Sequence, residues 1–75
     1  MQISIKLMGL LRDKSPPGGI LQLPDGATIE DALHALTIES ESIQVFTVNG
    51  QIVRDRHQRL QDGDALQVLP PVGGG

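Results

Sequence analysis

The sequence predicts a single small α+β domain in which one helix packs on a β-sheet. The chain has 75 residues, which is room for one hydrophobic core and one pair of layers. Apolar residues make up 39% of it and charged residues 20%, a balance typical of globular proteins. The hydrophobic pattern has a period of two in several short segments and a helical period in one. Strands and a single helix are therefore expected in the order β-β-α-β-β-β.

The first two strands are expected over residues 2–8 and 20–23. Ile3, Ile5 and Leu7 alternate with polar neighbours, which is typical of a half-buried strand. Residues 9–19 end in two prolines and two glycines and predict a loop without regular structure.

The helix is expected to begin after Thr28, whose hydroxyl can accept a hydrogen bond from a free amide of the first turn. Glu30 and Asp31 place negative charge where the helix dipole favours it, and both are expected to face solvent. Apolar residues recur at helical spacing from 29 to 36, and residues 37–42 predict the exit and a loop.

The second half of the chain predicts a hairpin and a last strand. Residues 45–48 and 51–53 are strand-like and flank Asn49-Gly50, a pair that favours a type I′ turn. A turn at residues 62–64 precedes the last strand, residues 65–69. The inward-facing apolar residues predict this core: Ile3, Ile5, Leu7, Leu21, Leu23, Ile29, Leu33, Leu36, Val48, Leu66 and Val68.

Composition argues against several classes of function. Lys and Arg number 6 and Asp and Glu 9, for a net charge of −3, so no direct nucleic-acid partner is expected. The absence of cysteine removes disulfides, iron–sulfur clusters and cysteine-ligated zinc. No membrane span is expected, and Met1 leads into a strand pattern rather than a signal peptide, so a cytoplasmic protein is expected.

Residues that could carry chemistry are few. His34 and His57 are expected on the surface, with no spacing that suggests a metal site. Asp62 and Asp64 are expected to be turn residues, because the strand after them supplies no further oxygen ligands for calcium. The cluster of arginines at 54–59 predicts a solvated loop face. We therefore expect no catalytic residue, no metal and no bound cofactor.

The tail at residues 70–75 is the unusual feature, following a domain expected over residues 1–69. Pro70-Pro71 favours an extended exit from the sheet, and six residues at about 3.5 Å each reach roughly 20 Å. Glycines lack a Cβ, so Gly74-Gly75 can thread a narrow tunnel and present a terminal carboxylate. A flexible, inert glycine end is the simpler alternative.

The chain resembles the MoaD/ThiS family of ubiquitin-like sulfur carriers. The resemblance covers the whole chain and is most specific from Val48 onward. It rests on the element order and on these segments: Val48-Asn49-Gly50, Ile52-Val53, Leu60-x-Asp62-Gly63-Asp64, Val68-Leu69-Pro70-Pro71-Val72 and Gly74-Gly75.

The resemblance implies a β-grasp fold, a mixed sheet of four to five strands on one main helix, with the first and last strands parallel. It also implies that the Gly75 carboxylate is adenylated by a partner similar to ubiquitin-activating enzymes, which uses ATP. The carboxylate then becomes a thiocarboxylate that gives its sulfur to an acceptor enzyme, such as molybdopterin-synthase large subunit or thiazole synthase. Pro71, Val72, Gly73 and Gly74 would thread the partner's active site, and the domain would carry sulfur without catalysing.

Molybdopterin synthesis is favoured as the pathway, with thiamine thiazole synthesis and tRNA thiolation as alternatives. A second function is open, in which Gly75 is conjugated to lysines of target proteins as in a ubiquitin-like modifier. A third is a plain interaction domain with an inert tail. If the first and last strands are parallel, the outward-facing Met8 and Leu69 meet beside the tail and predict a partner-docking patch.

Overall fold

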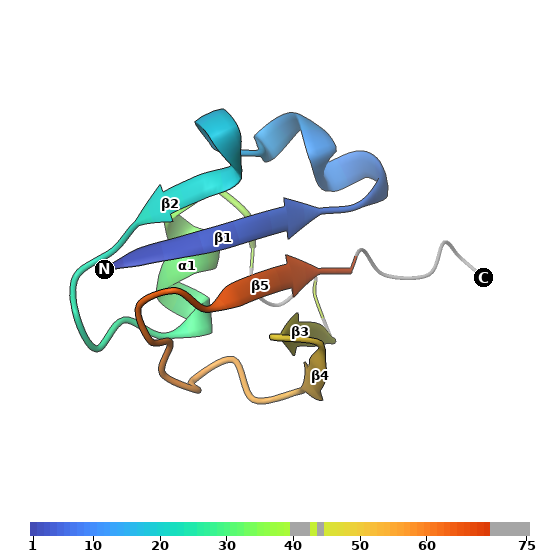
Figure 1. Ribbon diagram of the computed structural model, residues 1–75. Helices are drawn as coiled ribbons and strands as arrows, with labels where there is room; N and C mark the ends of the chain where they lie inside the picture. Colours follow the sequence, from blue (N-terminus) through green and yellow to red (C-terminus); the bar gives the residue numbers. More distant parts are fainter. Residues whose placement is uncertain (40–42, 44, 70–75) are drawn as a thin grey trace.

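The computed structural model describes residues 1–39, 43 and 45–69, and Figure 1 shows their arrangement. The strands and the helix follow the predicted order, with two short 3-10 helices between the first two strands. The elements are β1 (Gln2–Leu7), η1 (Gly9–Lys14), η2 (Pro17–Gly19), β2 (Ile20–Gln22), α1 (Ile29–Ala35), β3 (Phe46–Val48), β4 (Gln51–Val53) and β5 (Ala65–Val68).

All five strands form one mixed sheet in the spatial order β2-β1-β5-β3-β4. β1 and β5 run parallel, and every other neighbouring pair is antiparallel. In Figure 1 α1 lies behind the sheet, and no other described element covers the near face. The first and last strands thus lie side by side within a sheet packed on one helix, which is the β-grasp arrangement that was expected.

The core lies between α1 and the inward face of the sheet. Burial alternates strictly along β1, so Ile3, Ile5 and Leu7 point into the core. The predicted core is confirmed except for Leu21, which is only half-buried because β2 is an edge strand. The prediction left out buried residues on α1, in β3 and in the connecting segments: Ala27, Ala32, Ile38, Ile43, Phe46 and Leu60.

The connection at residues 9–19 is more regular than predicted. It forms η1 and η2, and Gly9 and Gly18 take positive φ values of 59° and 66° at their turns. Tight 3-10 turns are common in connectors, and here they let the partly buried Leu11 pack on the core. Within the described residues, every helix is too short or too polar to cross a membrane.

The Asn49-Gly50 hairpin is confirmed. Both residues have positive φ, 53° and 84°, as a type I′ turn requires. The Asn49 side chain also ties the turn to β5: its Oδ1 accepts from the Ala65 amide at 2.9 Å, and its Nδ2 donates to Asp64 Oδ1 at 2.9 Å. The hairpin is therefore joined to the central strand by side-chain as well as ladder hydrogen bonds.

Candidate functional site

The predicted chemical site, the tail, lies outside the described residues. This holds for Pro70, Pro71, Val72, Gly73, Gly74 and Gly75. What the structure defines is the root of the tail. Leu69, the last described residue, directly follows β5, which is the middle strand of the sheet. The root of the tail therefore follows a strand that has a hydrogen-bonded neighbour on each side.

The two residues of the predicted docking patch lie at the same end of the sheet. Leu7 pairs with Val68 in the parallel ladder, and the next residues along the two strands are Met8 and Leu69. Met8 keeps an extended backbone, with φ −114° and ψ 155°, so the alternation of β1 carries its side chain to the outward face. Met8 is 37% exposed and Leu69 is partly buried. The placement agrees with the patch, whose role in docking stays a prediction.

Two more apolar side chains belong to the outward face. Ile20 lies opposite Ser4 on β1, and Ile52 lies opposite Thr47 on β3. Both are exposed, Ile20 at 39% and Ile52 at 66%. The sequence pattern predicts only Met8 and Leu69 for this surface. Ile20 and Ile52 can be assigned to this face only from the pairing register of the edge strands β2 and β4. The hydrophobic pattern of the sequence does not give that register.

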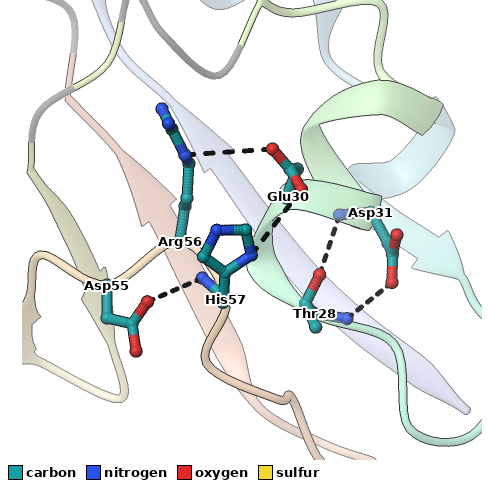
Figure 2. A network of polar contacts seen from close by, with 6 residues as sticks. All are labelled: Thr28, Glu30, Asp31, Asp55, Arg56 and His57. Atoms are coloured by element: carbon teal, nitrogen blue, oxygen red, sulfur yellow. Dashed lines mark hydrogen bonds and ion pairs between the residues drawn. The ribbon is translucent and has the colours of Figure 1, made fainter.

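A polar network surrounds the start of α1 (Figure 2). Thr28 Oγ1 accepts from the Asp31 amide at 3.2 Å, and Asp31 Oδ2 accepts from the Thr28 amide at 2.9 Å, a reciprocal capping box. Hydrogen bonding from the Thr28 amide is the main cause that lowers the pKa of the exposed Asp31 carboxyl. This carboxylate is thus engaged in capping the helix.

A loop segment occupies the remaining amides of the first turn. The Ile29 amide donates to the Gln58 carbonyl at 3.0 Å, and the Glu30 amide donates to the Arg56 carbonyl at 2.9 Å. Glu30 also faces Arg56 Nε and His57 Nδ1, each at 3.8 Å, the second forming an ion pair when His57 is protonated. Because the first-turn amides have partners within the chain, this end of α1 holds the loop rather than an anion.

Two sequence expectations need correction here. Glu30 was expected to face solvent, but its side chain is 29% exposed and contacts Arg56. Arg56 is likewise partly buried rather than part of a solvated loop face. The sequence could not show this because the two residues meet only when the loop packs along the helix. His34 and His57 are exposed as predicted.

The acidic residues of the last turn hold the fold together. Asp62 Oδ1 accepts from the Gln2 amide at 2.7 Å, and Asp64 Oδ2 accepts from the Gln61 amide at 2.8 Å. Both lie in the turn as expected, and Asp62 also links β1 to the loop before β5, whereas Asp64 closes the turn and accepts from Asn49 Nδ2. Among the described residues, no group of three or more His, Cys, Asp or Glu side chains is placed to hold a metal.

Comparison with known proteins identifies the family to which this chain belongs. The ThiS family matches residues 5–75, which is nearly the whole chain and includes the glycine tail. The chain belongs to the ThiS family. No curated protein sequence matches it closely enough to count as a relative.

Solved structures agree with the ThiS assignment. SAMP1 of Haloferax volcanii, a small archaeal modifier protein, is 25% identical, with 100% of both chains covered and a TM-score of 0.73. A Pyrococcus furiosus protein assigned as molybdopterin converting factor, subunit 1, is 25% identical over 96% of this chain and 99% of its own, with a TM-score of 0.70. The thiamine biosynthesis protein ThiS of Geobacter metallireducens, at 20% identity, shares the fold over 100% of both chains with a TM-score of 0.67.

These findings confirm the β-grasp fold and the sulfur-carrier family that the sequence resembled. ThiS-family proteins are small non-catalytic carriers, so this chain is a ubiquitin-like carrier protein and not an enzyme.

Proposed function

We propose that the chain carries sulfur on its Gly75 carboxylate, as a thiocarboxylate, for cofactor biosynthesis. The observation that supports this most strongly is the ThiS-family match, which extends through the three glycines at 73–75. Molybdopterin synthesis is the favoured pathway, with thiamine thiazole synthesis and tRNA thiolation as alternatives. The cytoplasmic location expected from the sequence belongs to this proposal.

The chemistry requires activation, because a carboxylate is a poor electrophile. The Gly75 carboxylate attacks the α-phosphorus of ATP on a partner enzyme, which releases pyrophosphate and forms an acyl-adenylate. A hydrosulfide nucleophile then attacks the acyl carbon and forms the C–S bond. The acyl–phosphate bond breaks, and AMP leaves. A persulfide donor gives the same product once a second thiol cleaves the resulting acyl disulfide. The chain itself contributes the carboxylate and its delivery, and ATP stays with the partner.

Two partners follow from this scheme. An adenylyltransferase similar to ubiquitin-activating enzymes would bind the domain and receive Pro71, Val72, Gly73 and Gly74 in its tunnel. A sulfur-acceptor enzyme, such as molybdopterin-synthase large subunit or thiazole synthase, would receive the loaded tail next. The similarity to a protein assigned as subunit 1 of molybdopterin converting factor supports an acceptor that works as a second subunit.

Deleting Gly75 tests the proposal. The shortened chain ends about 3.5 Å from the reacting position, and a misplacement of only about 1 Å can cost a reaction ~100-fold. We expect ATP–pyrophosphate exchange by the cognate adenylyltransferase to fall at least ~100-fold, with an unchanged melting temperature. Normal exchange by the shortened chain would disprove activation at Gly75.

A protein modifier is the second candidate, favoured by the similarity to SAMP1. The activation step is the same, but a lysine amine of a target attacks the acyl carbon and forms an isopeptide bond. Intact mass of the chain from its native cell separates the possibilities. A carrier shows one oxygen replaced by sulfur, a modifier appears in covalent adducts, and a domain with an inert tail shows neither.

A further inference from the structure

Asn49 and Gly50 form a pair whose own atoms can react with each other. The backbone nitrogen of a glycine can attack the side-chain carbonyl carbon of a preceding asparagine, because glycine has no Cβ to obstruct the approach. Asn49 is the single asparagine of the chain, and Gly50 follows it. Both residues are exposed at the tip of the β3–β4 hairpin, and a Cβ added at Gly50 would meet no described atom within 4 Å. The tip is therefore open to water and free of steric protection.

The closed hairpin holds the Asn49 side chain away from this reaction. Its Oδ1 accepts from the Ala65 amide and its Nδ2 donates to Asp64 Oδ1, both at 2.9 Å, so the carboxamide is fixed on β5. The Asn49 amide also donates to the Ala65 carbonyl at 2.8 Å. In an ideal type I′ turn the first central residue has φ and ψ of about 60° and 30°, which places the next backbone nitrogen away from Cβ. Attack by the Gly50 nitrogen therefore requires the backbone to rotate and both side-chain hydrogen bonds to break.

The reaction would remove the contacts that close the hairpin. The Gly50 nitrogen bonds to Asn49 Cγ and forms a succinimide ring, the Cγ–Nδ2 bond breaks, and Nδ2 leaves as ammonia with the proton of the Gly50 amide. Water then adds to one of the two ring carbonyls and opens the ring to aspartate or isoaspartate.

Both products are incompatible with the closed hairpin. Aspartate places a carboxylate oxygen where Asn49 Nδ2 now lies, 2.9 Å from Asp64 Oδ1, and two carboxylates at that distance repel each other. Isoaspartate lengthens the backbone by a methylene group inside a two-residue turn whose geometry sets the strand register. Either product therefore weakens the connection between the hairpin and β5.

We propose that Asn49 is a site of spontaneous deamidation whose rate is set by opening of the β3–β4 hairpin from β5. The product keeps the hairpin open, and because ammonia has left, the change is irreversible. β3 contributes the buried side chains of Phe46 and Val48 to the core, so loss of the hairpin contacts lowers the stability of the whole fold. Water is the only co-reactant, and the modification does not require that the chain carries sulfur.

The test follows the intact mass of the chain during incubation at mildly alkaline pH, in buffer and in urea. Deamidation replaces an NH group by oxygen, and peptide mapping places the change and separates aspartate from isoaspartate. We expect the folded chain to deamidate at least ~100-fold more slowly than the chain in urea, because the rate follows the population of the open hairpin. Asn49→Gly, which lacks the carboxamide, should show no change at this position under either condition.

Two substitutions in the turn before β5 separate hairpin opening from general loss of stability. Asp64→Ala removes the acceptor of Asn49 Nδ2 and should speed deamidation of the folded chain at least ~10-fold. Asp62→Ala is the matched control, because Asp62 lies in the same turn and accepts from the Gln2 amide instead. It should change the rate less than ~3-fold, since the hairpin keeps its hydrogen bonds. In urea both variants should deamidate at the rate of the unmodified chain.

Hydrogen exchange of the Ala65 amide gives a measurement that needs no variant. This amide donates to Asn49 Oδ1, so it exchanges when the same contact opens. Its protection should equal the slowing of deamidation within ~10-fold, because both report one opening equilibrium.

Several results would overturn the proposal. Deamidation of the folded chain as fast as in urea, or faster, would show that the closed hairpin does not restrain Asn49. Equal acceleration by Asp64→Ala and Asp62→Ala would assign the effect to global stability. Ala65 protection far greater than the slowing of deamidation would show that the reaction does not need this opening. Finally, Asn49→Asp reproduces one product, and unfolding of this variant at the urea concentration of the unmodified chain would show that the product leaves the hairpin closed.

Discussion

At the scale of single residues, Asp31 couples the stability of the fold to pH. Its carboxylate accepts the Thr28 amide, and this hydrogen bond is the largest cause of its lowered pKa. A carboxyl whose pKa is lower in the folded state stabilises that state above its unfolded pKa. The contribution then disappears as the pH falls through the folded value. Here the loss begins below the ordinary value of 3.8.

Asp31→Asn should therefore destabilise the protein at pH 7 and have a smaller effect at acidic pH. The amide can still accept a hydrogen bond but lacks the charge that favours the helix N-terminus. The measurement is the urea midpoint of both proteins from pH 7 down to pH values below 3.8. Asp13→Asn, at an exposed position in η1, is the matched control. A difference between Asp31→Asn and the unmodified chain that stays constant with pH would contradict the coupling.

At the scale of elements, the β3–β4 hairpin depends on Asn49 twice. Its backbone occupies positive φ, and its side chain bonds to Asp64 and to the Ala65 amide. The second role connects the hairpin to the strand that carries the tail. The hairpin is therefore bonded to its neighbours both at the turn, through the Asn49 side chain, and along β3, through the ladder with β5.

Substitutions at Asn49 should separate these two roles. Asn49→Gly keeps the turn geometry and loses the side-chain hydrogen bonds, so we expect about 1–2 kcal/mol of destabilisation. Asn49→Ala should cost about 1 kcal/mol more, because alanine is strained at positive φ. Urea unfolding at neutral pH measures both. Unfolding of Asn49→Gly at the same urea concentration as the unmodified chain would show that the side-chain bonds add nothing.

At the scale of the whole molecule, the parallel pairing of β1 and β5 joins the two ends of the domain. Met8 comes from the first strand and Leu69 from the last, with most of the sequence between them, and both follow the paired residues Leu7 and Val68. The parallel arrangement therefore places apolar side chains from both strands at the root of the tail. We therefore predict that a partner that receives the tail contacts this patch.

Leu69→Asp should weaken binding to the adenylyltransferase by at least ~10-fold. Because Leu69 is partly buried, a loss of up to about 1 kcal/mol in stability is expected as well. Met8→Asp, at the more exposed position, should weaken binding without that loss. Ala35→Asp places the same charge on α1, beyond the other face of the sheet, as a control. Calorimetric binding and thermal unfolding measure the two effects, and unchanged affinity in both patch variants would reject the patch.

Sequence patterns predicted most of the secondary structure, because strand alternation, helix capping and turn formation depend on interactions between residues that are near one another in the chain. The alternation along residues 2–8, the Thr28 cap and the Asn49-Gly50 turn each depend on neighbours within a few residues, and each appears in the structure. The family resemblance was carried by short segments in the second half of the chain. Residues 9–19 were missed because 3-10 turns have no strong periodic signal.

The sequence by itself determined the element order, most of the core and the character of the tail, since these depend on short-range periodicity and composition. Only the tertiary structure decided which strands are neighbours, and with that which side chains share the outward face. It joined Glu30 to Arg56 and grouped Ile20 and Ile52 with Met8. The physical reason is that these relations depend on strand register and loop packing between residues far apart in the chain, which no local pattern encodes.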